Sequence, residues 1–422
     1  MRNSAQQLLF GNETATTSAT GFRAVLTFKA NRGLGRHGWL RLTPAYSRHL
    51  VETLVSPLTS AARVLDPFCG TGTTALTCAE HGIRADTVDI NPFLVWLANV
   101  KFAAYAPTDI CAAQEFALSL QLHPHEEEGC WRPPLKDIQK WWDERDLRSL
   151  AGLLAAIKRI AVAKPARDLL FSAFCRVAIE TAAVSFGHQS MSFKARETGS
   201  LVVDIHEPSA IKALFRRRLK EVLAAAESPL DGGLARAVSG DSRRLDEVLG
   251  RRYSAVITSP PYPNRMSYIR ELRPYMYWLG YLADGRQAGE LDWQAIGGTW
   301  GCATSNLMRW APDPSVPVPF PGLPGIVERI AERSRILSIY VHKYFEDCVL
   351  HFRSLAKVLR KGATAHYIVG NSKFYDVMLP TELIYAEIMR QHGFVDVAVE
   401  NIRKRTSKKE LFEFIVNGRF AG

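Results

Sequence analysis

The sequence predicts an α/β fold, namely a Rossmann-like doubly wound parallel sheet that carries a mostly helical insertion. Within 61–92, two short apolar segments each end in a turn or an acid and flank a helical segment, which is the alternation of such a sheet. Residues 105–235 are instead rich in Ala, Leu, Arg and Lys at helical spacing. The strand pattern resumes at 236, so we divide the chain into 1–104, 105–235 and 236–422.

The first part shows a clear order of elements. The first 20 or so residues are polar and are expected to be poorly ordered. A helix is expected over 47–55, because apolar residues share one face and Ser47 or Thr43 can cap its start. The letters "RVLD" then indicate a strand, which is followed by a glycine turn and a helix that ends at Gly82.

The last part holds the remaining strands of the expected sheet. An aromatic-rich helix is expected over 268–283, followed by an irregular loop at about 285–325, a length that is usually functional or mobile. The other expected elements are strands near "ARAVSGDS" and "SAVITSPPY", a helix over 326–360, a strand in "ATAHYIVGNS", a helix over 380–392, and strands near "FVDVAVENI" and "LFEFIVNG".

Charge and cysteine content narrow the class of protein. The net charge of +11 and the pI of about 9.3 favour a polyanionic partner. Seven cysteines without a CxxC pair indicate reduced thiols rather than a disulfide frame or a zinc site. No apolar stretch approaches the ~18 residues that span a bilayer, and the N-terminus lacks the apolar core of a signal peptide. We therefore expect a cytoplasmic protein with no metal and no membrane partner.

The stretch "DPFCGTGTT" indicates a ligand site at the end of the first strand. Gly70 and Gly72 allow a sharp turn into a helix whose first N–H groups are free. A GK[ST] sequence and a third fingerprint glycine are missing, and Asp66 would repel a phosphate but suit an ammonium group. Asp89, which ends the next strand, can accept from both ribose hydroxyls. S-adenosylmethionine fits this set, and the alternative is an ordinary glycine turn of an α/β protein.

The stretch "TSPPY" ends another expected strand with two prolines, which cannot continue a sheet ladder. The Ser259 hydroxyl and the Pro260 carbonyl can hold an exocyclic amino group so that its nitrogen attacks an electrophilic methyl group. Tyr262 offers a face on which a planar base can stack, and a base of a duplex must be flipped out to reach it. The alternative is a plain strand end followed by a loop.

Taken together, "VLDPFCGTGTT" and "SPPY" resemble the amino-directed DNA methyltransferases, which modify cytosine N4 or adenine N6. The resemblance implies an S-adenosylmethionine domain whose cofactor-binding half is 1–104 and whose catalytic half is 236–422. It leaves 105–235 as a candidate target-recognition and DNA-binding region. The order of the two motifs resembles the subclasses that have an N-terminal cofactor half.

The resemblance also implies roles for single residues. Asp66 would meet the methionine end of the cofactor, Asp89 the ribose and Asp241 the adenine amino group, while "GWLRLTPAYS" would close over the methionine moiety. The implied cofactor-binding residues are Thr43, Pro44, Asp66, Pro67, Phe68, Cys69, Gly70, Thr71, Gly72, Thr73, Asp89, Ile90, Asn91, Asp241 and Ser242. The implied catalytic residues are Ser259, Pro260, Pro261 and Tyr262.

The implied activity is sequence-specific methylation of the N4 amine of a flipped cytosine in duplex DNA. In the family, Ser at the first tetrad position usually accompanies cytosine N4, and adenine N6 stays open as an alternative. The turn also resembles that of tRNA guanine-N2 methyltransferases, but those carry DPPYG, whereas Ser259 and Pro263 depart from it here. A cytosine-C5 enzyme is disfavoured because no Pro-Cys dipeptide occurs. A non-catalytic DNA-binding protein would explain the charge but not the Asp66, Asp89 and SPPY set.

Double-stranded DNA is the expected partner. The segments "SFGHQSMSFKARETGS" and "NIRKRTSKK" are expected to contact it, with solvated surface as the alternative for each. The candidate DNA-binding residues are Ser192, Lys194, Arg196, Arg265, Arg403, Lys404 and Arg405. Trp300 and Trp310 either cover the flipped base or pack on the core, whereas Trp131, Trp141 and Trp142 are expected in the core of the insertion. We expect a monomer or weak dimer in a prokaryotic nucleoid, with a separately encoded restriction endonuclease as a further partner.

Overall fold

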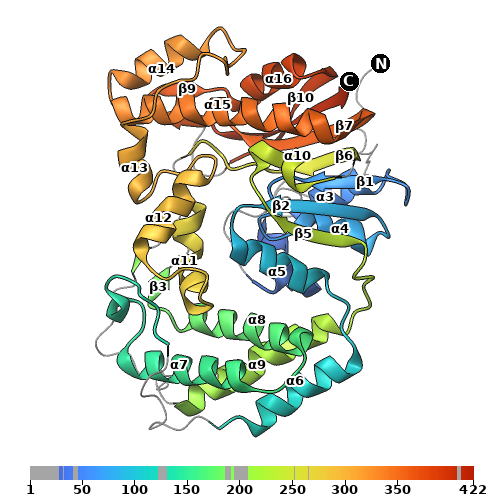
Figure 1. The fold of residues 1–422 in the computed structure, drawn as a ribbon, viewed down its shortest axis with the longest axis vertical. Coiled ribbons are helices and arrows are strands. Elements are labelled where there is room, and N and C mark those ends of the chain that lie inside the picture. The colour runs from blue at the N-terminus through green and yellow to red at the C-terminus, as the bar shows by residue number, and fades with distance from the viewer. Residues whose placement is uncertain are drawn as a thin grey trace, which may run out of the picture.

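A computed structural model describes residues 28–31, 33–40, 46–121, 131–185, 192–193, 208–250, 252–264, 266–405 and 410–422. A central sheet with its covering helices lies above a separate layer of helices, α6 to α9 (Figure 1). The predicted fold class is confirmed: an α/β Rossmann-like sheet with a mostly helical insertion, consistent with the S-adenosylmethionine-dependent methyltransferase fold. None of the described helices is both long and apolar enough to cross a membrane.

Seven of the described strands form one sheet, in the order β10-β11-β7-β6-β1-β2-β5. Neighbouring strands pair in parallel, except that β11 is antiparallel to β10 and to β7. The strands are β1 (Arg63–Asp66), β2 (Arg84–Asp89), β5 (Ala235–Ser239), β6 (Tyr253–Thr258), β7 (Leu359–Gly370), β10 (Phe394–Lys404) and β11 (Phe412–Phe420). Because β2 and β6 flank β1, the strand order reverses between β1 and β6, which is where doubly wound sheets bind ligands.

Both faces of this sheet are covered at its centre, so the central strands β1 and β6 are largely buried. Val64 and Ile257 pack with α3 and α4 on one face, whereas their neighbours Leu65 and Val256 pack with α15 on the other. The helices on the two faces are α3 (Arg48–Val55), α4 (Thr73–Glu80) and α5 (Pro92–Phe102), and α10 (Leu245–Val248), α15 (Arg335–Val358) and α16 (Thr381–Gln391). Short 3-10 turns are η1 (Phe28–Asn31), η2 (Gly35–Gly38), η3 (Ile138–Lys140) and η4 (Ser242–Arg244).

The insertion between α5 and β5 is mainly helical and shares its core with the sheet domain. Trp141 and Trp142 are 2% and 1% exposed, as expected, whereas Trp131 is 39% exposed and donates to the Tyr277 carbonyl. The same apolar cluster continues into α5 and α11, so the insertion is not packed on its own. Its elements are α6 (Pro107–Ser119), α7 (Glu144–Arg159), α8 (Lys164–Glu180), β3 (Val184–Ser185), β4 (Ser192–Phe193) and α9 (Pro208–Ala226).

The region 285–325 is more regular than its sequence indicated. It contains two short helices, and the helix expected over 326–360 is divided at 332–334, where Ser334 caps the second part. The elements of the catalytic half that lie outside the large sheet are α11 (Tyr268–Trp278), α12 (Gly285–Gln294), α13 (Cys302–Leu307), α14 (Leu323–Ala331), β8 (Ser372–Phe374) and β9 (Val377–Leu379).

Candidate active site

The glycine turn joins β1 to α4 at the carboxyl end of the sheet. Gly70 (φ +49°) and Gly72 (φ +75°) both adopt the left-handed conformation that favours glycine. A Cβ at Gly72 would lie 2.9 Å from Phe102 Cζ and 3.1 Å from Ala98 Cβ, because α5 packs directly on the turn. Position 72 therefore requires glycine because of both its backbone conformation and its packing. Position 70 requires glycine because of its backbone conformation alone.

Asp89, the last residue of β2, holds this turn in place. Its Oδ2 accepts from the Gly70 N–H at 3.0 Å, and its Oδ1 accepts from the Asn91 N–H at 2.9 Å. Burial raises the pKa of Asp89 to about 6, against the lowering effect of hydrogen bonds from the N–H groups of Asn91, Gly70 and Ile90. Each carboxylate oxygen keeps a second lone pair, so Asp89 can also accept from ribose hydroxyls.

Asp66, the last residue of β1, connects the two predicted halves of the site. Its Oδ1 accepts from the Phe68 N–H at 3.1 Å and from the Thr258 hydroxyl at 2.6 Å. Thr258 ends β6 and directly precedes Ser259, so one carboxylate joins the glycine turn to the SPPY stretch. The second oxygen, Oδ2, is buried without a hydrogen-bond partner in the described part of the chain, and burial raises the pKa of Asp66 to about 7. Such an oxygen suits an ammonium group.

The other predicted turn residues form the packed floor of this site. Pro67, Cys69, Thr71 and Thr73 are all buried. Lys101 of α5, which the sequence did not single out, is 1% exposed and donates from Nζ to the Thr71 carbonyl at 3.0 Å. Burial lowers the pKa of Lys101 to about 8. A lysine within an apolar helix gave no sequence signal for this contact.

Asp241 follows β5, at the position expected to approach the cofactor adenine. Both of its oxygens already accept from Arg243, with Oδ2 at 2.7 Å from Nη2 and Oδ1 at 3.0 Å from Nε. Arg243 also pairs with Asp347 of α15 at 2.7 Å. Burial alone raises the pKa of Asp241, but the hydrogen bonds and charge of Arg243 outweigh it and hold the pKa below its usual value. Asp241 therefore stands in an ion-pair network with Arg243 and Asp347, and its contact with the cofactor adenine stays a prediction.

His351 of α15 joins two of the predicted cofactor residues and was missed by the sequence analysis. Its Nδ1 donates to the Ser242 carbonyl at 2.9 Å, and its Nε2 accepts from the Tyr367 hydroxyl at 2.7 Å. Its ring lies 5.0 Å from that of Phe68. Burial lowers the pKa of His351 to about 4, so the imidazole is neutral at pH 7.

The SPPY stretch is held by tyrosines from other elements. The Tyr344 hydroxyl of α15 donates to the Pro261 carbonyl at 2.6 Å, and the Tyr262 N–H donates to the Tyr268 hydroxyl at 3.4 Å. Pro260 is buried, whereas Ser259, Pro261 and Tyr262 are half-buried. These contacts fix the backbone of the turn and leave the Ser259 end at the carboxyl edge of the sheet.

Tyr262 is also enclosed by the end of β7 and by Arg405. A Cβ at Gly370 would lie 2.8 Å from Tyr262 Cε2, so the ring packs on bare backbone there. The Arg405 guanidinium carbon lies 5.6 Å from the Tyr262 ring centre, and its Nη1 donates to the Asn371 carbonyl at 3.1 Å. Burial raises the pKa of Tyr262, so the phenol stays protonated. Arg405, a candidate DNA contact, thus lies against the predicted base-stacking ring.

The chain is similar to type II methyltransferases. It is 20% identical to the type II methyltransferase M.BsoBI of Geobacillus stearothermophilus over 91% of this chain and 83% of that protein. It is 18% identical to M.MvaI of Kocuria varians over 83% of this chain and 79% of that protein. M.AvaI of Anabaena variabilis is 35% identical over 72 residues, which is 17% of this chain and 15% of that protein. No family model matches the sequence.

A solved rRNA methyltransferase, aviRa from Streptomyces viridochromogenes, aligns with 89% of this chain and 86% of its own at 15% identity, with a TM-score of 0.29. That score is too low to support a shared fold, so the fold assignment rests on the strand order of the sheet. The similarity to type II methyltransferases supports a methyltransferase, and hence the use of S-adenosylmethionine.

Several predicted residues fall outside the described part of the chain. These are Thr43, Pro44, Lys194, Arg196 and Arg265. Ser192 begins strand β4, and Arg403 is paired with Glu413 across the β10–β11 ladder at 2.5 Å. Lys404 is exposed. Of the candidate DNA contacts whose side chains the structure describes, Lys404 is thus exposed, whereas Arg403 and Arg405 have protein partners.

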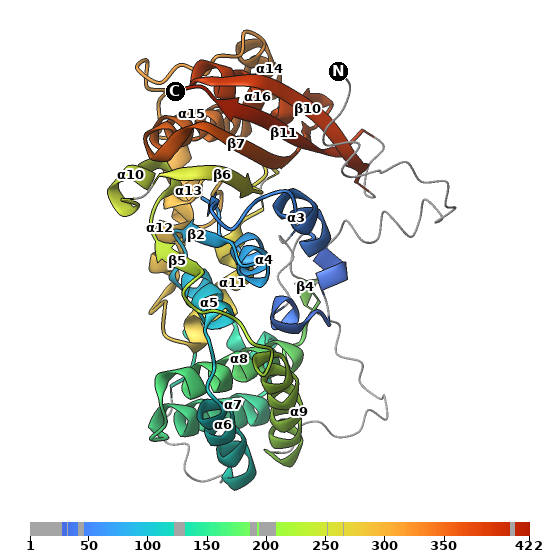
Figure 2. The same cartoon turned by 90° about the vertical axis from the view of Figure 1, so that its right-hand side faces the viewer.

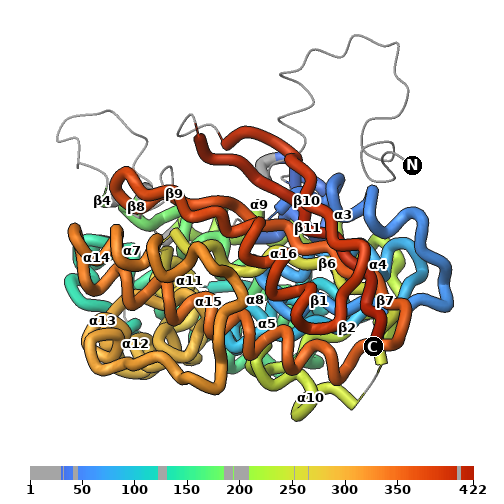
Figure 3. The backbone as a smooth tube through the Cα atoms, turned by 90° about the horizontal axis from the view of Figure 1, so that it is seen from above, coloured from blue at the N-terminus to red at the C-terminus, as the bar shows by residue number. Residues whose placement is uncertain are grey.

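The described residues of the two segments expected to contact DNA lie on one side of the molecule. Strand β4 and the end of the hairpin at which β10 stops and β11 begins both lie in the right-hand half of Figure 2. The view from above agrees, since both lie along the upper edge of Figure 3. The catalytic corner is connected to this side through Arg405, which follows β10 directly.

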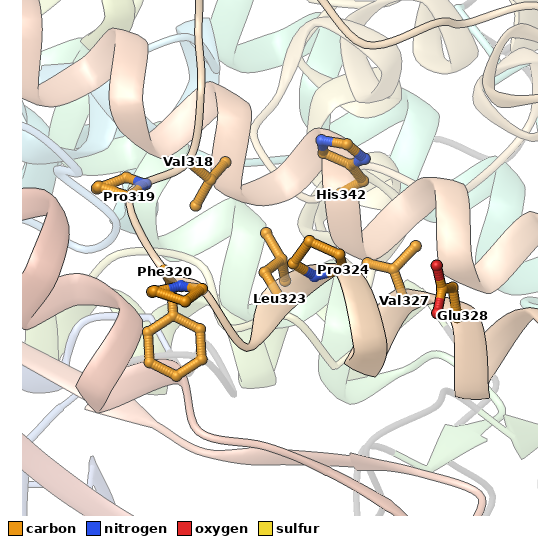
Figure 4. Close-up of a pocket in the computed structure, with 9 residues that line it drawn as sticks. Val318, Pro319, Phe320, Leu323, Pro324, Val327, Glu328 and His342 are labelled. Carbon is orange, nitrogen blue, oxygen red and sulfur yellow. The ribbon is translucent and has the colours of Figure 1, made fainter.

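Trp300 and Trp310 differ in their surroundings. Trp300 lies over Arg273, and its backbone N–H donates to Asp292 at 2.7 Å. Trp310 packs edge-on against His342 with ring centres 5.7 Å apart. His342 borders a pocket of about 650 Å³ between α14 and α15 that contains none of the predicted site residues (Figure 4). Its lining residues are Val318, Pro319, Phe320, Pro321, Leu323, Pro324, Val327, Glu328 and His342.

The described residues contain no group of three or more His, Cys, Asp or Glu side chains placed to hold a metal ion.

Proposed function

We propose that the protein is a sequence-specific DNA methyltransferase that transfers a methyl group from S-adenosylmethionine to the N4 amine of a cytosine flipped out of duplex DNA. One contact carries the proposal: the Asp66 carboxylate accepts from both Phe68 of the glycine turn and Thr258 beside Ser259. A methyl donor on the turn and an amine at Ser259 would therefore meet at the point where the strand order reverses.

The glycine turn would hold the cofactor. Asp89 would accept from the ribose hydroxyls, and the free Oδ2 of Asp66 would accept from the ammonium group. Phe68, backed by the neutral His351, would pack beside the adenine. The bound cofactor supplies an electrophilic methyl group on sulfur.

The SPPY corner would orient the amine. The Ser259 hydroxyl and the Pro260 carbonyl would each accept one N–H of the cytosine amine, which aims the nitrogen lone pair at the methyl group. The Tyr262 ring would stack on the base, and Tyr344 and Tyr268 would keep the turn rigid. Nitrogen forms the new bond to carbon as the carbon–sulfur bond breaks, and the amine then loses one proton to solvent, so that no covalent enzyme intermediate is required.

Three observations support DNA as the partner. The chain has a net charge of +11, its relatives are type II methyltransferases, and the described parts of the two candidate contact segments, β4 and the end of β10, lie on one side. One of them, β4, belongs to 105–235, so we assign target recognition to this insertion. Ser259 favours cytosine, and adenine N6 is the second candidate because its amine fits the same pair of acceptors.

Methyl transfer to nucleic acid tests the proposal directly. The protein is incubated with S-adenosylmethionine that carries a labelled methyl group, in parallel with mixed-sequence duplex DNA and with tRNA. We expect label in DNA and none in tRNA, and Ser259→Ala should remove the DNA signal. Label in tRNA alone would favour an RNA methyltransferase, and label in neither would contradict the proposal.

A further inference from the structure

Arg273 of α11 lies between two tryptophans that come from different parts of the chain. Its guanidinium carbon is 5.4 Å from the ring centre of Trp141, in the insertion, and 5.2 Å from that of Trp300, in the catalytic half. Trp141 is 2% exposed, and the backbone N–H of Trp300 donates a hydrogen bond to Asp292. Cation–π contacts with two indoles stabilise the position of the guanidinium, whose N–H donors make no hydrogen bond within the described residues.

Arg273 has a second cation beside it and is not ion-paired within the described residues. Arg270 lies one helical turn earlier on α11, and both side chains are half-buried. Within the described residues, neither side chain makes a hydrogen bond or an ion pair. Burial, and then the charge of Arg270, lowers the pKa of Arg273 to about 10, against smaller raising effects of Tyr277 and Glu271. Glu271 is the acid whose charge reaches Arg273, but it forms no ion pair with either arginine in the described residues. Two neighbouring guanidinium groups that are not ion-paired favour an anionic ligand with several acceptor oxygens.

The position of this pair is set by contacts at both ends. Trp141 also packs edge-on against Phe193 of β4, with ring centres 5.7 Å apart. The first residue of α11, Tyr268, accepts from the Tyr262 N–H. The two arginines therefore lie between β4 and the corner where a flipped base would stack.

We propose that Arg270 and Arg273 form a phosphate site for the DNA strand that carries the flipped base. This inference rests on the proposed function, because a base held on Tyr262 brings its own strand past the start of α11. Arg273, held between Trp141 and Trp300, presents its edge to the phosphate oxygens, and Arg270 adds a second charge. Because phosphates carry no sequence, the site fixes the position of the strand and does not select bases.

The salt dependence of DNA binding tests this site. Binding of a fluorescent duplex to the full chain is measured at several salt concentrations for the wild type, Arg270→Gln, Arg273→Gln and Arg273→Lys. Each lost phosphate contact lowers the slope of log K against log salt by about 1 and weakens binding by about tenfold at low salt. We expect both Gln variants to show this loss on every duplex sequence, with unchanged affinity for S-adenosylmethionine. Arg273→Lys should recover the slope but not the full affinity, because it keeps the charge without the fork.

Arg286→Gln is the matched control, because Arg286 on the neighbouring α12 is 85% exposed and paired only with Glu290. This variant removes the same charge, and its salt slope and its DNA affinity should equal those of the wild type. If Arg273 only joins the insertion to the catalytic half, its Gln variant will lower the thermal unfolding midpoint while both Gln variants keep the wild-type salt slope. That result would overturn the phosphate site. A wild-type protein that binds no duplex would overturn the proposed function itself.

Discussion

The cofactor side and the target side of the candidate site are built in different ways. On the cofactor side, Asp66 and Asp89 bind backbone N–H groups that are 2, 19 and 2 residues away in the sequence. On the target side, Pro261 is held by Tyr344, which is 83 residues away, and Tyr262 is enclosed by Gly370 and Arg405. The first site is a local motif, whereas the second is assembled by the whole sheet.

This difference implies that substitutions on the two sides have separable effects. Changes at Asp66 or Asp89 should act on cofactor affinity, because we propose that these carboxylates bind the cofactor. Changes at Ser259, Tyr262 or Arg405 should act on turnover and leave cofactor affinity intact. Asp66 is an exception, because its hydrogen bond with Thr258 connects the cofactor side to the target side. Changes at Asp66 should therefore affect both cofactor affinity and turnover.

The largest effect is expected at the target side. Ser259→Ala and Tyr262→Ala should each lower kcat roughly a hundredfold or more, because an oriented acceptor or the stacking surface for the base is lost. The dissociation constant of S-adenosylmethionine, measured by calorimetry, should stay as in the wild type. Wild-type methylation rates in both variants would show that the amine is not held at this corner.

A smaller effect is expected for Asp89→Ala, and it should fall on cofactor affinity rather than on turnover. The variant loses the acceptor for the ribose hydroxyls and the anchor of the Gly70 N–H. Because hydrogen bonds to a charged group are lost, cofactor binding should weaken by about tenfold to a hundredfold. At saturating cofactor, kcat should recover towards the wild-type value. A kcat that stays low at saturation would break the separation of the two sides.

Cofactor binding should depend on pH through Asp66. Its pKa of about 7 means that the carboxylate needed for an ammonium group forms mainly above neutral pH, so affinity should rise about tenfold from pH 6 to 8. In Asp66→Asn the midpoint of the remaining dependence should fall to about 6, the pKa of Asp89. Folding stability should change with pH in the opposite direction to cofactor affinity. Because burial raises the pKa of Asp66 above its usual 3.8, the contribution of this carboxyl to the free energy of unfolding is fully present below pH ~4 and is lost as the pH rises through about 7.

The smallest effect is expected at Arg405. Arg405→Gln removes the cation from the Tyr262 ring, a contact that contributes about 0.5–1 kcal/mol, so kcat should fall by about two- to fivefold. Lys404→Gln removes the same charge from the exposed neighbour and is the matched control. An equal loss of kcat in the two variants would show that the effect comes from losing a positive charge in this region rather than from losing the contact with Tyr262.

The sequence predicted the local parts of this molecule well. The fold class follows from short strands that alternate with helices, and the glycine turn from Gly70 and Gly72, since both depend on neighbouring residues. The region 285–325 was expected to be irregular because of its glycines and prolines, although Asp284 and Gln287 form a helix-start pattern that the structure uses.

The remote parts of the site could not be predicted from the sequence. His351, Tyr344 and Arg405 reach the site from α15 and from the end of β10, and no local pattern links them to the glycine turn or to SPPY. Arg270 and Arg273 look like ordinary charged residues of an amphipathic helix until Trp141 and Trp300 are placed on either side. Their roles depend on the order of strands in the sheet, which is a tertiary property.

Mass spectrometry of nucleosides shows whether SPPY orients an exocyclic amine towards a methyl donor on the glycine turn. Duplex DNA is treated with the wild type and with Ser259→Ala, digested and analysed. The account predicts N4-methyl-deoxycytidine after wild-type treatment and none after treatment with the variant. DNA without any methylated nucleoside, or methylation at a ring carbon rather than at an amine, would contradict it.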